Sequence, residues 1–339
     1  MTKNEIDIEG FKIHISSLKE ENLIPEYFRA PLIAQWEITR ACNLRCVFCY
    51  NNSGKKHPNE LTYEQKINVA KQIIDEKIYR LCISGGEPIL DESFWELTKI
   101  FKNGNILCNT ITNGWEVNSE TAPLYTKYFS SIQISLDSSN EKIHDKLRGR
   151  RGSWRRAVNA CKLIVENKGH LMVSTVVTPF NIGEVSELID LSYKLGAANH
   201  RLDEAMLLGR AAKNKDSVAL TKKQYVDLSN IVKEKKKQYE KSRFFIDLLP
   251  KTKYSYIAAS AKIPPLLMYI SPTGTCAIDS DMPFSGGSLK EKTLKEIWDV
   301  LKTSHKNKEF IRQSLKVKTK KDFTKLDEIP YLKGELHDQ

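Results

Sequence analysis

The sequence predicts an α/β fold, namely a partial (β/α)6 barrel that is shorter than the common eight-unit TIM-like barrel. Between residues 34 and 206, short β-rich runs alternate with helical patterns, which is typical of parallel strands joined by crossover helices. A chain of 339 residues is long enough for one large core, or for one core and a small appendage. The six candidate strands are residues 33–38, 80–84, 106–112, 131–136, 171–178 and 200–205.

The helices between these strands have recognisable starts. Thr62 and Gln65 form a capping box, and Ile67, Ala70 and Ile74 follow at helical spacing. Similar segments with apolar periodicity open at Asp91, Ser153 and Glu184.

The pattern changes after residue 210. Thr221 and Gln224 cap a long lysine-rich helix that we expect to end near residue 241, with a buried stripe made of Tyr225, Leu228, Ile231 and Val232. Residues 244–249 and 266–270 are candidate strands, residues 271–274 form a turn, and Thr293 caps another helix. We therefore expect an N-terminal extension at 1–30, a core barrel at 31–212, a small α+β region at 213–310 and a basic tail at 311–339.

The composition restricts the partners only in part. No stretch approaches the roughly 20 apolar residues of a membrane span, so we expect no membrane partner. The net charge of +11 is densest at residues 233–237 and 316–325, where no aromatic residues alternate with the lysines. Such runs are usually solvated faces, and an acidic peptide would suit the charge as well as RNA would. Nucleic acid is therefore not expected, and an RNA-modifying enzyme rests on the charge alone.

Three cysteines in one short stretch, Cys42, Cys46 and Cys49, carry the strongest chemical signal. Their C-x3-C-x2-C spacing supplies three soft thiolates, which suits a [4Fe–4S] cluster and leaves one iron open. Structural zinc is the alternative, but zinc loops usually bring pairs of ligands. An odd total of seven cysteines, without a signal peptide, favours a reducing cytoplasm over disulfides. The four remaining cysteines are isolated, namely Cys82, Cys108, Cys161 and Cys276.

These three cysteines, with Phe48 before the last of them, resemble the signature of the radical S-adenosylmethionine (SAM) superfamily. Further motifs of that family follow in the same order, at the ends of the second, third and fourth candidate strands and in the segment after the fourth. The last of them resembles a motif of the branch that includes peptide-modifying members. The resemblance runs from about residue 31 to residue 210 and returns, weakened, at residues 269–298. The motif segments are residues 84–88 (SGGEP), 111–114 (ITNG), 135–137 (SLD) and 144–149 (HDKLRG).

The resemblance implies one [4Fe–4S] cluster and SAM as cofactors. One electron, supplied by a flavodoxin- or ferredoxin-type donor, would cleave SAM to a 5′-deoxyadenosyl radical that abstracts hydrogen from the substrate. It also implies a partial barrel with its site at the C-terminal strand ends, followed by a SPASM/twitch-like region. That region carries auxiliary clusters in the family, but only Cys276 stands near its turn here, so we expect none.

The resemblance assigns SAM contacts residue by residue. Ser84, Gly85 and Gly86 would bring the backbone close to SAM, and Glu87 would accept a hydrogen bond from its ammonium group. Polar contacts to the ribose or methionyl part would come from Asn113, Ser135 and Asp137, for which strand-end capping is the alternative. Arg148 would pair with the SAM carboxylate or be a solvated arginine. Phe48 would pack near the adenine or simply within its loop.

Candidate catalytic residues are Asp203 and Glu204, which with Arg201 end the sixth strand, and Cys276. Arg201, Asp203, Glu204 and His144 would contact the substrate. A structural ion pair among the first three explains these charged residues equally well. The Cys276 thiol would return a hydrogen atom to a substrate radical. The other isolated cysteines are expected to be small buried apolar residues.

The function that we expect is hydrogen abstraction from a ribosomally made peptide or a protein side chain, ending in a crosslink, epimerisation or dehydrogenation. The first 26 residues are short for a leader-binding domain, which favours the alternative of a small-molecule enzyme acting on a tetrapyrrole, nucleotide or sugar. A non-catalytic binding protein that keeps the fold is a second alternative, disfavoured because all three cysteines and Glu87 are present.

Overall fold

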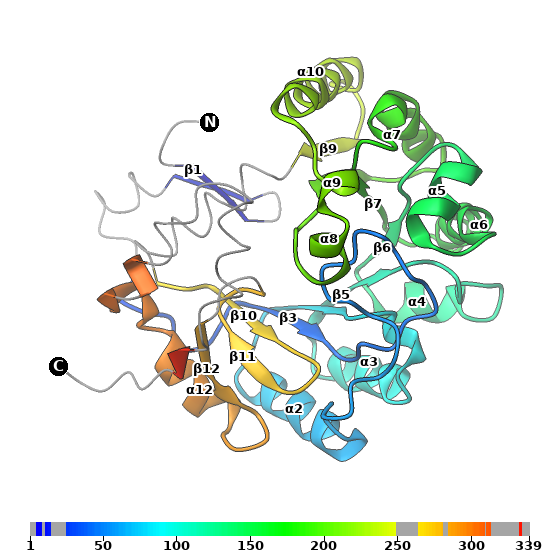
Figure 1. Ribbon diagram of the computed structural model, residues 1–339. Coiled ribbons are helices and arrows are strands. Elements are labelled where there is room, and N and C mark those ends of the chain that lie inside the picture. The colour runs from blue at the N-terminus through cyan, green and yellow to red at the C-terminus, as the bar shows by residue number, and fades with distance from the viewer. Residues whose placement is uncertain are drawn as a thin grey trace.

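The structure is a computed structural model, and it describes residues 5–8, 11–14, 25–248, 264–280, 284–308, 310–312 and 332–333. Strands β1 (Glu5–Ile8) and β2 (Phe11–His14) pair with each other. The other described strands form one sheet in the order β13-β12-β11-β10-β3-β4-β5-β6-β7-β8-β9 (Figure 1).

The six predicted strands form the centre of this sheet, and each agrees with its prediction within one residue at either end. They are neighbours in chain order and all run parallel, which confirms the partial barrel. Their bounds are β3 (Ile33–Glu37), β4 (Arg80–Ser84), β5 (Leu107–Thr112), β6 (Ser131–Ser135), β7 (Leu171–Val177) and β8 (Asn199–Glu204).

Helices connect these strands and cover the outer face of the sheet (Figure 1). The outward-facing Trp36 of β3, fully buried, meets Phe101 of α3 edge to face, which shows how the helices close the core. The connecting helices are α2 (Tyr63–Asp75), α3 (Phe94–Asn103), α4 (Ala122–Tyr128), α5 (Glu141–Arg148), α6 (Ser153–Glu166) and α7 (Val185–Lys194).

The helix starts predicted at Thr62, Ser153 and Glu184 are confirmed, with α6 beginning at Ser153. Thr62 and Gln65 form the box that opens α2. Glu184 is the N-cap of α7, which follows the short 3-10 turn η2 (Ile182–Glu184). The helix start predicted at Asp91 is too early, because α3 begins at Phe94 with Ser93 as its N-cap. Asp91 instead ends the 3-10 turn η1 (Pro88–Leu90), and its side chain accepts a hydrogen bond from the Ser93 backbone N–H.

The region after residue 210 extends the sheet at both edges. After the short α8 (Gly209–Lys213) and α9 (Lys215–Val218), α10 (Lys222–Gln238) begins at the predicted Thr221 capping box. Strand β9 (Phe245–Leu248) pairs with β8 at one edge of the sheet. Strand β10 (Leu267–Ile270) pairs with β3, and both pairings are parallel.

An antiparallel extension follows, made of β11 (Thr275–Ala277) and β12 (Phe284–Ser288). Helix α12 (Leu294–Leu301) packs on this extension and begins at a capping box. The 3-10 turn η3 (Ser304–Lys306) and β13 (Leu332–Lys333), parallel to β12, complete the elements. The predicted basic run at 316–325 lies outside the described residues.

Two apolar clusters organise the described residues. The large one lies between the sheet and its helices, and the small one surrounds the cysteine stretch with Leu44, Phe48, Leu147 and Leu207. No helix in the part of the chain that the structure describes is long and apolar enough to cross a membrane.

Candidate functional site

The three cysteines lie on the loop that follows β3, and none forms a disulfide. Each sulfur accepts a hydrogen bond from an N–H group: Cys42 from the Leu44 backbone at 3.4 Å, Cys49 from the Ser53 backbone at 3.4 Å, and Cys46 from the Arg148 guanidinium at 3.7 Å. Hydrogen bonds of this kind stabilise a thiolate and tune an iron–sulfur cluster.

The donor set fits a [4Fe–4S] cluster, since it consists of three soft sulfurs on one loop, each with a hydrogen-bond donor. Among the described residues, no group of three or more His, Cys, Asp or Glu side chains is gathered around a single ion. A cluster binds each cysteine through a separate iron, so its ligands need not converge on one point.

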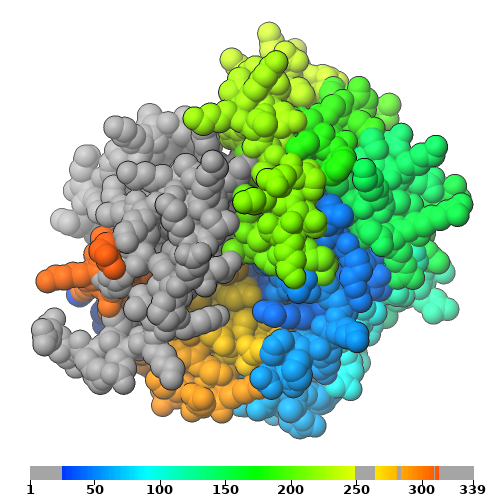
Figure 2. All heavy atoms as spheres, in the orientation of Figure 1, coloured from blue at the N-terminus to red at the C-terminus, as the bar shows by residue number. Residues whose placement is uncertain are grey.

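The loop is fixed from the opposite side by α8 and the residues after it. Arg210 donates to the Cys46 carbonyl at 3.0 Å and to the Ser53 carbonyl at 2.8 Å, and Asn214 donates to the Val47 carbonyl at 2.9 Å. In Figure 2 the yellow-green atoms of this segment lie against the blue part of the chain that carries the loop. The cysteine loop is therefore held by elements from both ends of the barrel.

The Gly85–Gly86 turn after β4 packs directly on the chain just before the cysteines. The Gly86 N–H donates to the Thr39 carbonyl at 2.7 Å, and the Glu87 N–H donates to the Ala41 carbonyl at 2.8 Å. A Cβ on Gly86 would lie 2.7 Å from the Arg40 carbonyl and closer still to that of Ala41. The close approach predicted for these glycines is thus made first to the protein's own backbone.

Ser84, which precedes this turn, is the last residue of β4. Its hydroxyl is buried and has no hydrogen-bond partner among the residues that the structure describes. Buried hydroxyl groups are seldom left unpaired. A polar ligand at this strand end would satisfy the Ser84 hydroxyl, which agrees with the predicted SAM contact.

Glu87 connects three of the motifs. Its carboxylate, fully buried, accepts from the Thr112 hydroxyl at 2.6 Å and from the Asn113 N–H at 2.8 Å. The Asn113 side chain donates in turn to Asn43 at 2.8 Å and faces the Cys42 sulfur at 4.0 Å. Burial raises the pKa of Glu87 to about 7, against the lowering effect of its two hydrogen bonds.

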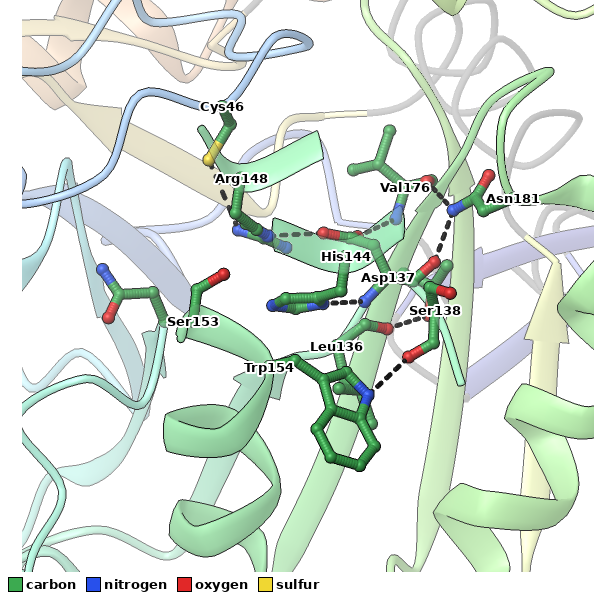
Figure 3. Close-up of polar contacts among 12 residues, drawn as sticks. Cys46, Leu136, Asp137, Ser138, His144, Arg148, Ser153, Trp154, Val176 and Asn181 are labelled. Atoms are coloured by element: carbon green, nitrogen blue, oxygen red, sulfur yellow. Dashed lines mark hydrogen bonds and ion pairs between the residues drawn. The ribbon is translucent and has the colours of Figure 1, made fainter. Parts of the chain in front are cut away.

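Asp137 and Arg148 form a buried ion pair beside Cys46 (Figure 3). The Asp137 carboxylate accepts from the Arg148 Nε and, at 2.9 Å, from the Val176 N–H. The Arg148 guanidinium carbon lies 5.2 Å from the centre of the Phe48 ring. The alternative of a solvated arginine is wrong, since Arg148 is 8% exposed. The SAM carboxylate as its partner stays a prediction.

His144 is buried beside this pair. Its Nδ1 accepts from the Asp137 backbone N–H at 3.1 Å, and the residue is 1% exposed. Burial lowers the pKa of His144 to about 4, so the ring is neutral at pH 7. The substrate contact of His144 stays a prediction, which its burial does not favour.

Glu37, the last residue of β3, was not among the residues predicted from the sequence. Its carboxylate is fully buried and accepts hydrogen bonds from Tyr50 and Asn51, which immediately follow the last cysteine. A glutamate at the end of the strand that leads into the cysteines was the available signal. Glu37 thus anchors the end of the cysteine loop to the strand from which the loop starts.

The candidate catalytic residues are not brought together. On β8, Arg201 pairs with Asp203 at 2.9 Å, so the predicted ion pair exists, and Asp203 lies beside Val176 in the sheet register. Glu204 ends the same strand. Ser135, on β6, is 8% exposed.

Cys276 lies on β11 and belongs to the large core, not to the cluster around the cysteine loop. It is fully buried, and burial raises the pKa of its thiol. The prediction that the remaining three isolated cysteines are buried is confirmed, on β4, β5 and α6 for Cys82, Cys108 and Cys161.

Known proteins share this fold and these motifs. Residues 36–192 match the model of the radical SAM superfamily. The chain is 37% identical over 175 residues to the mycofactocin maturase MftC of Mycolicibacterium smegmatis, a match that covers 50% of this chain and 43% of that protein. It is 25% identical over 292 residues to the AdoMet-dependent heme synthase of Methanosarcina barkeri, covering 80% and 82%.

Among solved structures, SuiB of Streptococcus suis bound to the precursor peptide SuiA has the same fold, with a TM-score of 0.66 and 18% identity over 84% of this chain and 67% of that one. The match to the maturase spans less than half of that protein's length. The matched segment, residues 36–192, contains the cysteine loop and the strand-end residues from Ser84 to Asp137, and over this segment the chain is similar to the radical SAM superfamily.

Proposed function

We propose that this chain is a radical SAM enzyme that modifies a ribosomally made peptide or a protein side chain. The observation that carries the proposal is the set of three cysteine sulfurs, each with its own N–H donor. Asn113 links one of them, Cys42, to the buried Glu87. The likeness to a maturase and to a structure with a bound precursor peptide supports the peptide as substrate.

When bound, the cluster and SAM supply one-electron cleavage of SAM and hydrogen abstraction from the substrate. Cys42, Cys46 and Cys49 would hold three irons and leave the fourth for SAM. Glu87 keeps lone pairs beyond those used by Thr112 and Asn113, so it can accept from the SAM ammonium group.

The polar groups at the neighbouring strand ends would orient SAM. The Ser84 hydroxyl, unpaired among the described residues, can donate to it, and Ser135 lies at the end of β6. Phe48, buried in the loop, would exclude water beside the adenine. Asp203 and Glu204, at the end of β8, are the charged groups that we assign to the substrate side.

The test is anaerobic reconstitution with iron and sulfide, followed by iron counting and by assay of 5′-deoxyadenosine formed from SAM under dithionite. We expect about four irons per chain and product formation. Cys46→Ala should lose both, whereas the control Cys82→Ala, a core cysteine, should keep both. Bound zinc without deoxyadenosine would overturn the proposal, and about eight irons would show an auxiliary cluster.

A tetrapyrrole is the second candidate substrate, because the likeness to heme synthase covers most of both chains. Incubation with a candidate peptide or a tetrapyrrole separates the two, since only a true substrate should raise deoxyadenosine formation above its basal rate. The expected electron donor is a flavodoxin- or ferredoxin-type protein. None of the seven cysteines forms a disulfide, which supports a reducing compartment such as the cytoplasm.

Cys276 as the donor of a hydrogen atom stays a prediction. It requires that Cys276→Ala abolish or redirect the product while SAM cleavage continues. An unchanged product would make the thiol a core residue, as its full burial favours.

A further inference from the structure

The Arg148 side chain joins a cysteine ligand to a buried carboxylate. Its Nε donates to Asp137, and its Nη1 donates to the Cys46 sulfur at 3.7 Å (Figure 3). The sulfurs of Cys42 and Cys49 accept from neutral backbone N–H groups instead. Among the described residues, Cys46 is thus the cysteine of the loop with a charged donor.

We propose that Arg148 sets the reduction potential of the cluster: its guanidinium, positioned by Asp137, hydrogen-bonds to the Cys46 thiolate and makes the cluster easier to reduce. The inference rests on the proposed function, because it requires a cluster on the three cysteines. It concerns the electron-accepting step, which precedes any contact with substrate.

The physical reason is the charge that reduction adds. An electron placed on the cluster makes it more negative, so a fixed cation and an N–H donor at a ligating sulfur favour the reduced form. Arg148 and Asp137 are both shielded from water, where charges act on each other more strongly than in solvent. Because the guanidinium contacts the sulfur and Asp137 lies behind it, the positive charge dominates at the cluster and the carboxylate partly offsets it.

The guanidinium is held in place from several sides. Asp137 accepts from the Val176 N–H, and its backbone carbonyl accepts from Asn181 at 2.6 Å. The C-terminal turn of α5 also binds the cysteine loop, where the Arg45 N–H donates to the Arg148 carbonyl at 3.1 Å. An arginine side chain stays protonated in proteins, so the guanidinium held here is a cation.

This geometry disfavours the SAM carboxylate as the partner of Arg148. Bidentate recognition of a carboxylate uses two adjacent nitrogens of the guanidinium fork. Asp137 takes the single N–H of Nε, which removes the Nε/Nη2 pair, and Cys46 takes one of the two N–H groups of Nη1, so only part of the fork is left for a carboxylate. The two assignments also differ in a measurable way, since the potential can be determined without SAM.

The experiment is a redox titration of the reconstituted protein, followed by electron paramagnetic resonance without SAM, together with iron content and SAM affinity. Arg148→Met should lower the potential, and Asp137→Asn, which leaves the cation uncompensated, should raise it. Arg148→Lys keeps the charge and should fall between wild type and Arg148→Met. The control is Arg150→Met, because Arg150 binds the loop at the Asn43 carbonyl, 2.9 Å away, but no sulfur; its shift should be clearly smaller.

Shifts of opposite sign in Arg148→Met and Asp137→Asn support the inference. If Arg148→Met assembles the cluster, keeps the wild-type potential and binds SAM more weakly, the inference is overturned and Arg148 is a SAM contact. If Arg150→Met shifts the potential as much as Arg148→Met does, the inference is also overturned, because the effect would then come from nearby positive charge in general. If Arg148→Met does not assemble a cluster, Arg148→Lys and Asp137→Asn decide by the same signs. A wild-type protein that binds no cluster would instead overturn the proposed function.

Discussion

Glu87 shows how one residue can connect stability to the candidate site. Its carboxyl is fully buried and its pKa is raised from 4.5 to about 7, because burial disfavours the charged form. The folded state therefore binds more protons than the unfolded state between these values. The free energy of unfolding should fall as the pH rises through this window, by up to about 3 kcal/mol in total.

Urea unfolding of the iron-free protein under reducing conditions, at pH values from 5 to 8, measures this dependence. Glu87→Gln cannot ionise and should flatten the profile. The matched control is Glu64→Gln, an exposed glutamate in the first turn of α2 whose pKa is lowered, so its titration lies below the window. Equal slopes for wild type and Glu87→Gln would show that Glu87 does not titrate there.

The motifs predicted which residues gather at the site but not what each one touches. Cys42, Glu87 and Asn113 were expected together and lie within one hydrogen-bonded chain. The partners of Arg148 were not foreseen, because Asp137 and Cys46 lie on the segments that follow two different strands, β6 and β3, and meet only through packing. Glu37 was not predicted for the same reason, because its partners Tyr50 and Asn51 lie after the last cysteine, at the far end of the loop.

At the scale of elements, the junction between the Gly85–Gly86 turn and the cysteine loop has the tightest geometry. A Cβ on Gly86 would press on the backbone carbonyls of Arg40 and Ala41, which cannot rotate away. Gly86→Ala should lower the free energy of unfolding by about 1–3 kcal/mol and reduce the iron bound per chain. Gly183→Ala is the control, because nothing lies within 4 Å of its Cβ.

Chemical unfolding and iron counting of the two variants measure these effects. Gly183→Ala should stay within about 0.5 kcal/mol of wild type with full iron content. If Gly86→Ala kept both its stability and its iron, the turn would be free to move away from the loop, and the glycine would be explained by the approach of SAM instead.

The central strands were predictable because each is a short β-rich run that ends in a polar or glycine motif. The antiparallel strands β11 and β12 were not predicted. β11 has three residues, and β12 contains Gly286 and Gly287, which have no side chains to give an alternating pattern. Their pairing depends on a core supplied by α12, which local sequence does not reveal.

For the whole molecule, the sheet crosses the boundary predicted at residue 212. β9 covers the free edge of β8, and β10 covers that of β3, so the region after the barrel closes both edges of the six central strands. The Trp298 indole of α12 also donates to the Phe28 carbonyl at 2.9 Å, which joins the C-terminal region to the start of the barrel. Sequence patterns located these strands, but pairing between distant segments is decided by the complete fold.

The last prediction concerns this continuity. A chain cut after residue 212 would leave β3 and β8 as long, unpaired edges, and such edges promote aggregation. We expect the cut chain to aggregate, and a chain cut after residue 248, which keeps β9, to leave only the β3 edge open and to aggregate less. The full chain should unfold in one transition by circular dichroism and tryptophan fluorescence. A monomeric 212-residue chain that folds cooperatively and binds iron would instead make the predicted boundary a true domain boundary.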